Sequence, residues 1–170
     1  DTVTATVTDT YTFTPGTLAV RKIVTGTAAG AQGEVQISVV CTSEGRSVLD
    51  TTVTIAAGET EPEASEFPGL AAGTECTVTE SVNGETEAVS VTVTGEGTVT
   101  VPAGGSVEAA ITDTYEFRPG TFAVRKDIAG DGAGRQSEVV LTVTCTSGLS
   151  DTITIPAGTT EPTTEEYENL

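Results

Sequence analysis

Three ionisable side chains fall on strand faces that are otherwise apolar. Lys22 alternates with Leu18 and Val20, Glu80 with Cys76 and Val78, and Asp113 with Ile111 and Tyr115. Because alternate residues of a strand face the same side of a sheet, the lysine and both acids should point into one core. Burial disfavours a charged ammonium and a charged carboxylate, so the lysine can become a neutral amine and one acid a neutral proton donor. The chemistry open to such a group is attack of the amine on a carboxyl carbon of the same chain.

The distribution of lysine supports this interpretation. The only two lysines of the chain are Lys22 and Lys126, and they occupy the same position of an internal repeat. A solvated acidic surface would scatter its few lysines over loops and outward faces. Two other interpretations stay open: a buried, hydrogen-bonded ion triad that contributes little net stability, or a strand register that leaves Lys22 at an exposed sheet edge.

The three cysteines are widely spaced and contain no Cys-x-x-Cys pair, which disfavours a metal or redox motif. Cys41 shares its strand face with Ile37 and Val39, and Cys76 also faces inward. A disulfide between them would close a loop of about 35 residues and contribute roughly 4 kcal/mol by the chain-entropy estimate. The alternative is two free buried thiols that behave as small hydrophobes. Cys145 is then unpaired, and its partner is expected beyond residue 170.

The repeat has an offset of 104 residues. Thr8-Asp9-Thr10-Tyr11 recurs as Thr112-Asp113-Thr114-Tyr115, and 20 of the 34 positions from Thr8 to Cys41 are identical in the second copy. Lys126 therefore corresponds to Lys22, and Asp9 corresponds to Asp113. The pattern predicts a tandem array: residues 1–13 are the closing strand of a preceding repeat, 14–117 a complete repeat, and 118–170 the first half of a second, truncated repeat. After the cysteine the offset falls to 100, because the loop at Ser147 is shorter than its counterpart at 44–49.

The elements that must position the candidate residues are short strands. Thr and Val are abundant, and clusters of Gly, Pro and Asn separate the strand patterns. We expect strands near residues 18–25, 34–42, 50–56, 75–81, 86–94, 98–101 and 106–115, with loops at 28–33, 58–68 and 95–97. Asn83-Gly84 is typical of a hairpin turn. About seven antiparallel strands in roughly 100 residues predict an all-β, immunoglobulin-like sandwich.

The composition excludes several classes of function. Across 170 residues, 25 acidic against 7 basic side chains give a net charge of -18, which disfavours nucleic acid and anionic membranes as partners. No histidine is present, so the usual general base and the commonest zinc ligand are missing and an enzyme is not expected. No apolar run is long enough to span a bilayer, and any secretion or anchoring signal is expected outside this stretch.

Two acidic loops are weak candidates for ligand sites. Asp127 and Asp131 lie in a glycine-rich loop, but the first copy has neither aspartate there and the spacing fits no EF-hand pattern. The segment 59–66 is rich in glutamate. Solvated loops explain both better than a metal or ligand site does, so we expect no metal and no cofactor.

The motifs around the three ionisable residues resemble a known family. The stretches are Ala-Val-Arg-Lys ending at Lys22, Ala-Gly-Thr-Glu-Cys-Thr-Val-Thr-Glu ending at Glu80, and Ala-Ile-Thr-Asp-Thr-Tyr around Asp113. Their order and spacing resemble the collagen-adhesin B-type (Cna B-like) domains of Gram-positive surface proteins and pili, and are most similar to an uncharacterised repeat family of actinobacterial surface proteins. The resemblance implies a spontaneous isopeptide bond with Lys22 as nucleophile, Asp113 as acceptor and Glu80 as proton shuttle for this self-crosslinking.

The expected function is therefore structural. We expect an extracellular stalk or fibre repeat, attached to the cell surface or cell wall, whose crosslink joins the first and last strands. Its partners would be neighbouring repeats of the same chain. Head-to-tail self-association is a further possibility, with the strand 1–13 carrying Asp9 to Lys126 of another chain. The alternative is an adhesin-type module that binds a host or matrix ligand, although the sequence offers no aromatic cluster for such a surface.

Overall fold

In the computed structural model, residues 1–146 and 148–170 are described, and they form two compact units, Asp1–Arg118 and Pro119–Leu170. The strands of the first unit are β1 (Pro15–Thr25), β2 (Val35–Ser43), β3 (Arg46–Ile55), β4 (Ser65–Ala71), β5 (Glu75–Asn83), β6 (Val89–Thr94), β7 (Gly97–Thr100) and β8 (Ser106–Phe117). Those of the second unit are β9 (Thr121–Lys126), β10 (Val139–Thr144), β11 (Ser150–Ile155) and β12 (Thr163–Glu168). The described residues contain no helix, and therefore none long and apolar enough to cross a membrane.

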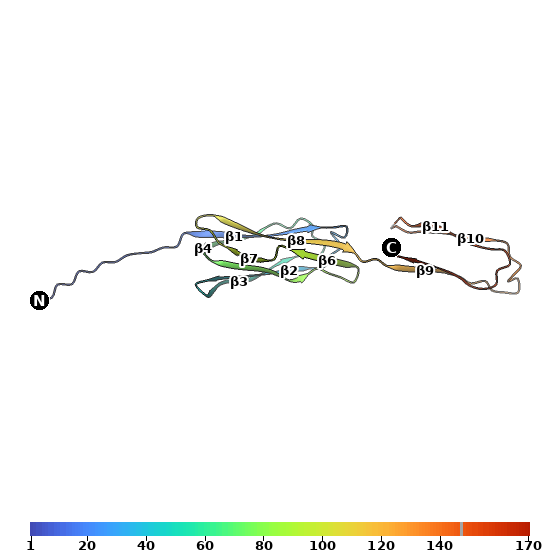
Figure 1. Ribbon diagram of the computed structural model, residues 1–170, viewed down its shortest axis with the longest axis horizontal. Helices are drawn as coiled ribbons and strands as arrows, with labels where there is room; N and C mark the ends of the chain where they lie inside the picture. Colours follow the sequence, from blue (N-terminus) through green and yellow to red (C-terminus); the bar gives the residue numbers. More distant parts are fainter. Residues whose placement is uncertain (147) are drawn as a thin grey trace. The chain divides into compact units, whose positions relative to one another are not determined.

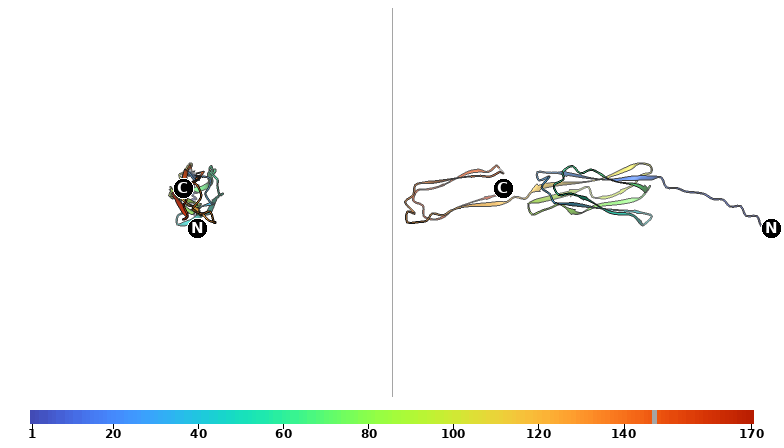
Figure 2. Two further views of the ribbon diagram at one scale, coloured as in Figure 1. Left: turned by 90° about the vertical axis from the view of Figure 1, so that its right-hand side faces the viewer. Right: turned by 180° about the vertical axis from the view of Figure 1, so that it is seen from behind.

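The first unit is a sandwich of two four-stranded sheets, with strand orders β4-β1-β8-β6 and β3-β2-β5-β7 (Figure 1). The view from behind in Figure 2 shows the same two layers. Their inner faces supply one core of alternating strand residues, in which Tyr115 is the largest fully buried side chain. The all-β, immunoglobulin-like sandwich predicted from the sequence is confirmed, because period-2 alternation places one face of each strand in this core.

One pair of strands is parallel, which corrects the expectation of a purely antiparallel sandwich. The first strand, β1, lies beside the last, β8, in parallel register from Thr17 opposite Ser106 to Thr25 opposite Thr114. Their pairing joins residues 89 positions apart in sequence, such as Thr17 and Ser106, and no local signal encodes the relative direction of such a pair.

The segment 58–68, expected to be a loop, ends within strand β4. This strand pairs antiparallel with β1 through a register irregularity near Thr17, which lies opposite Pro68. Proline is tolerated there because β4 is an edge strand, in which one side of the backbone needs no ladder partner. The expectation of a loop was wrong for residues 65–68. Glycine, proline and glutamate in this segment interrupt the alternation of apolar and polar residues that indicates a strand.

Asn83-Gly84 is not a hairpin turn. Strand β5 ends at Asn83 in one sheet, and the chain resumes as β6 at Val89 in the other sheet. Gly84 has φ +73°, and a Cβ atom there would lie 3.0 Å from the Tyr115 hydroxyl oxygen. Glycine is therefore needed for a left-handed residue that crosses between the sheets against a buried tyrosine.

The second unit consists of two strand pairs, β10-β11 and β12-β9. Their small core gathers around Val143, Ile153 and Ile155. The loop that contains Ser147, where the sequence predicts a shortening relative to the first copy, lies outside the described residues in part. Residues 1–13 of the first unit form no strand and are exposed throughout, so Asp9 lies in solvent.

Candidate functional site

Lys22 is buried in the centre of the first unit. It lies on β1 between β4 and β8, it is 4% exposed, and it shares its strand face with Leu18 and Val20. An unpaired ammonium in such a place would cost several kcal/mol, so a lysine here needs partners. The interpretation that placed Lys22 at an exposed sheet edge is wrong, because the side chain is buried and its backbone lies opposite Ile111 of β8.

Two carboxyl groups meet the lysine amine inside the core. Nζ of Lys22 donates a hydrogen bond to Oε1 of Glu80 and also contacts Oδ1 of Asp113. The side chains are 1%, 2% and 0% exposed for Lys22, Glu80 and Asp113 respectively. The structure thus brings together the three residues that the alternation pattern had placed on inward faces.

Strand register explains how the three residues meet. Asp113 lies opposite Val24 in the parallel β1–β8 pair, so it is displaced by two residues from Lys22 on the same face of the sheet. A long lysine side chain can span that diagonal. Glu80 comes from β5 in the facing sheet, where it lies opposite Ile37 of β2. The amine therefore bridges the two layers of the sandwich.

Tyr115 also belongs to the site. In the sequence it indicated only which face of its strand points into the core. It is fully buried, its hydroxyl donates to the backbone carbonyl of Asn83 at 2.7 Å, and its oxygen lies 2.6 Å from Oδ2 of Asp113. Burial raises the pKa of Tyr115 far above its usual value, so the phenol is neutral. The recurrence of Asp-Thr-Tyr at residues 9–11 and 113–115 was the signal that could have paired this tyrosine with the aspartate.

Burial also raises the pKa of Glu80, an effect that the hydrogen bond from Lys22 opposes. The backbone amide of Glu80 donates to the carboxylate of Glu96 at 2.5 Å at the rim of the site. Oε2 of Glu80 has no hydrogen-bond partner among the described residues. A carboxyl group with a raised pKa and a free oxygen can accept and keep a proton, which is the property required of an acid–base group.

The chemistry this arrangement permits is condensation of an amine with a carboxyl group. Lys22 and Asp113 are separate side chains in contact. Glu80 also contacts the Lys22 amine and can accept a proton from it. Low exposure keeps bulk water away from the reacting atoms, which favours amide formation over hydrolysis. The same contacts also describe a buried ion triad, so the geometry allows the reaction without requiring it.

The predicted disulfide between Cys41 and Cys76 is confirmed. It joins β2 and β5, where the two residues lie directly opposite each other, and its sequence separation is 35 residues. Cys145 lies in the second unit as a free, half-buried thiol. Lys126, the counterpart of Lys22, is half-buried at the end of β9.

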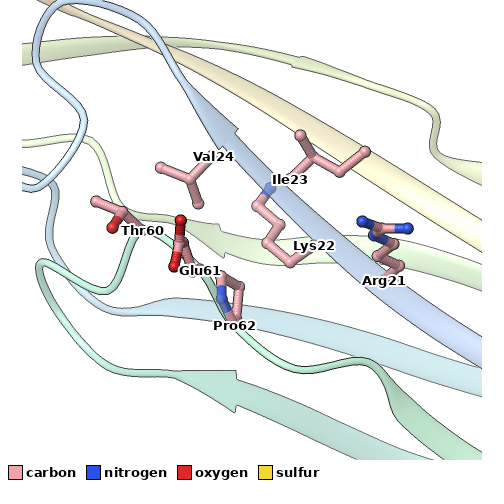
Figure 3. Close-up of a pocket in the computed structure, with 7 residues that line it drawn as sticks. All are labelled: Arg21, Lys22, Ile23, Val24, Thr60, Glu61 and Pro62. Atoms are coloured by element: carbon pink, nitrogen blue, oxygen red, sulfur yellow. The ribbon is translucent and has the colours of Figure 1, made fainter.

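The remaining candidate ligand sites are superficial. A surface hollow of about 300 Å³ lies between residues 21–24 of β1 and residues 60–62 (Figure 3). In the second unit, Asp127 forms an exposed ion pair with Arg125 at 2.9 Å, and Asp131 is exposed. Within residues 1–146 and 148–170, no group of three or more His, Cys, Asp or Glu side chains could hold a metal ion.

Fold and site together define an immunoglobulin-like β-sandwich with a lysine and two acids buried between its layers. Residues 18–116 match the family described as "Domain of unknown function (DUF5979)", and the chain belongs to that family. The match begins in β1 and ends in β8, so it includes the whole Lys22, Glu80 and Asp113 cluster. No curated protein matches the chain.

Two solved structures show a limited likeness. A bacterial adhesin from Mobiluncus mulieris, described as containing intramolecular disulfide, isopeptide and ester bond cross-links, is 21% identical over 61% of this chain and 41% of its own, with a TM-score of 0.38. The pilus-presented adhesin Spy0125 (Cpa) is 17% identical over 61% of this chain and 28% of its own, with a TM-score of 0.40. The chain thus spans less than half the length of either adhesin. Likeness at this level does not transfer their properties to this protein.

Proposed function

We propose that the first unit is a structural repeat of a cell-surface stalk or fibre, in which Lys22 and Asp113 condense into an intramolecular isopeptide bond. The observation that carries the proposal is the position of the Lys22 amine, which contacts the carboxyl groups of both Glu80 and Asp113 in a core closed to solvent. A protein that needed only a stable core would gain more from apolar side chains of the same volume than from a buried ion triad. The cluster is best explained by a reaction among its members.

The reaction balances with the groups present. Glu80 takes a proton from the Lys22 ammonium, and the neutral amine then attacks Cγ of a protonated Asp113. The Nζ–Cγ bond forms, a C–O bond of Asp113 breaks, and that oxygen leaves as water after receiving a second hydrogen from the nitrogen. Glu80 keeps the proton that it took, and the raised pKa of this carboxyl favours that final state.

The bond would join the two strands that tension reaches first. Force applied at the two ends of the unit enters at β1 and leaves at β8, and these strands are direct neighbours in parallel register. Without a crosslink, the load would fall on the hydrogen bonds between them. With it, the load would pass from Lys22 to Asp113 through covalent bonds alone, and residues 23–112 would carry none.

We further propose that the second unit begins another copy of the same repeat, and that residues 1–13 close a preceding copy. The proposal for residues 1–13 rests on their sequence match to the end of the first copy, and two structural features support the proposal for the second unit. Tyr167 lies opposite Phe122 in the β12–β9 pair, as Phe67 lies opposite Leu18 in the β4–β1 pair. Gln136 also holds its loop as Gln32 does, accepting from a glycine amide and donating to a backbone carbonyl at 2.5 Å, against 2.8 Å for Gln32.

The crosslink can be tested by intact mass with and without reduction of the disulfide. The proposal expects the loss of one water, and recovery of Lys22 and Asp113 in one branched peptide after protease digestion. Lys22→Arg should abolish the loss, whereas Lys126→Arg, at the matching position of the second unit, should leave it unchanged. A wild-type mass that lacks only the disulfide hydrogens would refute the crosslink and favour the alternative of a ligand-binding adhesin module.

A further inference from the structure

The cluster around Lys22 has more acids than cations. Lys22 is the only cation that contacts Glu80 or Asp113 in the described part of the chain, and Tyr115 is neutral. With both carboxyls ionised the cluster would carry a net charge of −1, and Glu96 at the rim adds further negative potential. An uncompensated charge in a site this dry is strongly disfavoured, so one carboxyl should retain a proton. Charge balance does not say which carboxyl it is.

The contacts of the Tyr115 hydroxyl decide between them. A phenol has a single hydrogen to donate. The Asn83 carbonyl oxygen can only accept, and it lies 2.7 Å away, so the phenol hydrogen is directed to it. Oδ2 of Asp113 lies 2.6 Å from the same phenol oxygen, well within hydrogen-bond range. One phenol hydrogen cannot serve both contacts, so the second contact is satisfied when Oδ2 carries the hydrogen.

We propose that Tyr115 holds the shared proton of the cluster on Oδ2 of Asp113, and thereby selects Oδ2 as the oxygen that leaves and Oδ1 as the carbonyl oxygen of the amide. The second half of this statement rests on the proposed crosslinking function. It agrees with the contact between the Lys22 amine and Oδ1, the oxygen that remains. In the reaction, the Cγ–Oδ2 bond breaks, and Oδ2 departs as water with its own hydrogen and one taken from Nζ.

If the hydrogen bond between Tyr115 and Asp113 ran in the opposite direction, removal of the hydroxyl would shift the ionisation of Asp113 in the opposite direction. If Tyr115 instead donated its hydrogen to an ionised Asp113, removing the hydroxyl would make the acid easier to protonate. If Tyr115 accepts from a protonated Asp113, removing the hydroxyl makes the acid easier to ionise. The direction of a pH shift therefore tests the proposal, and a general loss of stability would not produce a shift of defined sign.

The experiment follows crosslinking after a short pulse of cell-free synthesis of the full chain. The fraction of chains that have lost water is measured by intact mass over time and over a series of pH values. The alkaline limit is the pH above which crosslinking slows because Asp113 loses its proton. Tyr115→Phe should slow crosslinking about tenfold and move this limit to lower pH by about one unit, as expected for loss of one buried hydrogen bond. Tyr167→Phe, which removes the phenol contact to Asp151 at 2.9 Å in the second unit, is the matched control and should change neither value.

A second perturbation preserves the shape of the side chain in case Tyr115→Phe fails to fold. In a Tyr11→Phe, Tyr167→Phe background, 3-fluorotyrosine enters only at position 115, where it donates more strongly and accepts more weakly. In an uncrosslinked Lys22→Arg chain of this background, weaker acceptance should shift the infrared carbonyl band of protonated Asp113, whereas an ionised Asp113 would give no such band. A move of the alkaline limit to higher pH, or no move, with Tyr115→Phe would overturn the proposal, and so would the absence of the infrared band.

Failure of the crosslinking function has a different signature. If the wild-type chain loses no water at any pH, the reaction proposal fails and the cluster persists as separate side chains. Infrared difference spectra of that protein would then test the proton directly. A protonated-carboxyl carbonyl band that disappears in Asp113→Asn and shifts in Tyr115→Phe would support the assignment, and the absence of such a band would overturn it.

Discussion

Stretching the first unit from its two ends separates the roles of the proposed crosslink and the disulfide. The 103 residues from Pro15 to Phe117 would span about 350 Å when fully extended at ~3.4 Å per residue. The disulfide, with its separation of 35 residues, withholds about 120 Å of that length. If Lys22 is joined to Asp113, residues 23–112 are withheld as well, and almost no length is left to release.

Single-molecule force spectroscopy on the full chain can measure these lengths. The wild-type first unit should show no unfolding step at forces that unfold ordinary sandwiches. Lys22→Arg should release a step, and adding a reductant to that variant should lengthen the step by about 120 Å. This difference does not depend on the size of the folded unit. A wild-type protein that gives the same step as Lys22→Arg would refute the load path through Lys22 and Asp113.

Three further tests probe the packing around the site by denaturant unfolding. Asp113→Ala removes both the crosslink and the partner of a buried lysine and should cost at least about 3 kcal/mol, whereas the exposed Asp9→Ala should be neutral; equal effects would contradict the buried pairing. Gly84→Ala places a Cβ 3.0 Å from the Tyr115 oxygen and should cost about 2 kcal/mol or more, against about 1 kcal/mol for Gly73→Ala, which has a similar positive φ in open space. Reducing the disulfide in Lys22→Arg should lower the free energy of unfolding by up to about 4 kcal/mol, and Cys145→Ala should have no effect in the same assay.

The inward orientation of the site residues could be predicted because it depends only on the alternation of residues within each strand. Lys22, Glu80 and Asp113 each follow apolar residues at alternate positions, and the period of a strand then fixes the face on which they lie. The pairing of Cys41 with Cys76 followed from the same alternation. Tyr115 was assigned to the core by this rule, but its hydrogen bond to Asn83 depends on the path of the chain between the sheets, which the rule does not describe.

The features that the sequence did not predict are relations between distant segments. Asn83-Gly84 has the local signature of a hairpin, and the same left-handed glycine serves equally well to carry the chain from one sheet to the other. Strand β4 was hidden because an edge strand tolerates proline and needs only one apolar face. The parallel neighbours β1 and β8 are chosen by the packing of the whole sandwich and not by either strand's own residues.

The parallel direction of β1 and β8 also sets where the polypeptide enters and leaves. Had the first and last strands been antiparallel neighbours, the chain would exit beside its entry point and the module would project sideways from its own connections. With strands that run the same way, the chain enters at one end and leaves at the other. Strands of 11 and 12 residues at about 3.3 Å per residue advance it by roughly 40 Å. The points where the chain enters and leaves this unit are therefore separated by about the length of one strand and do not lie side by side.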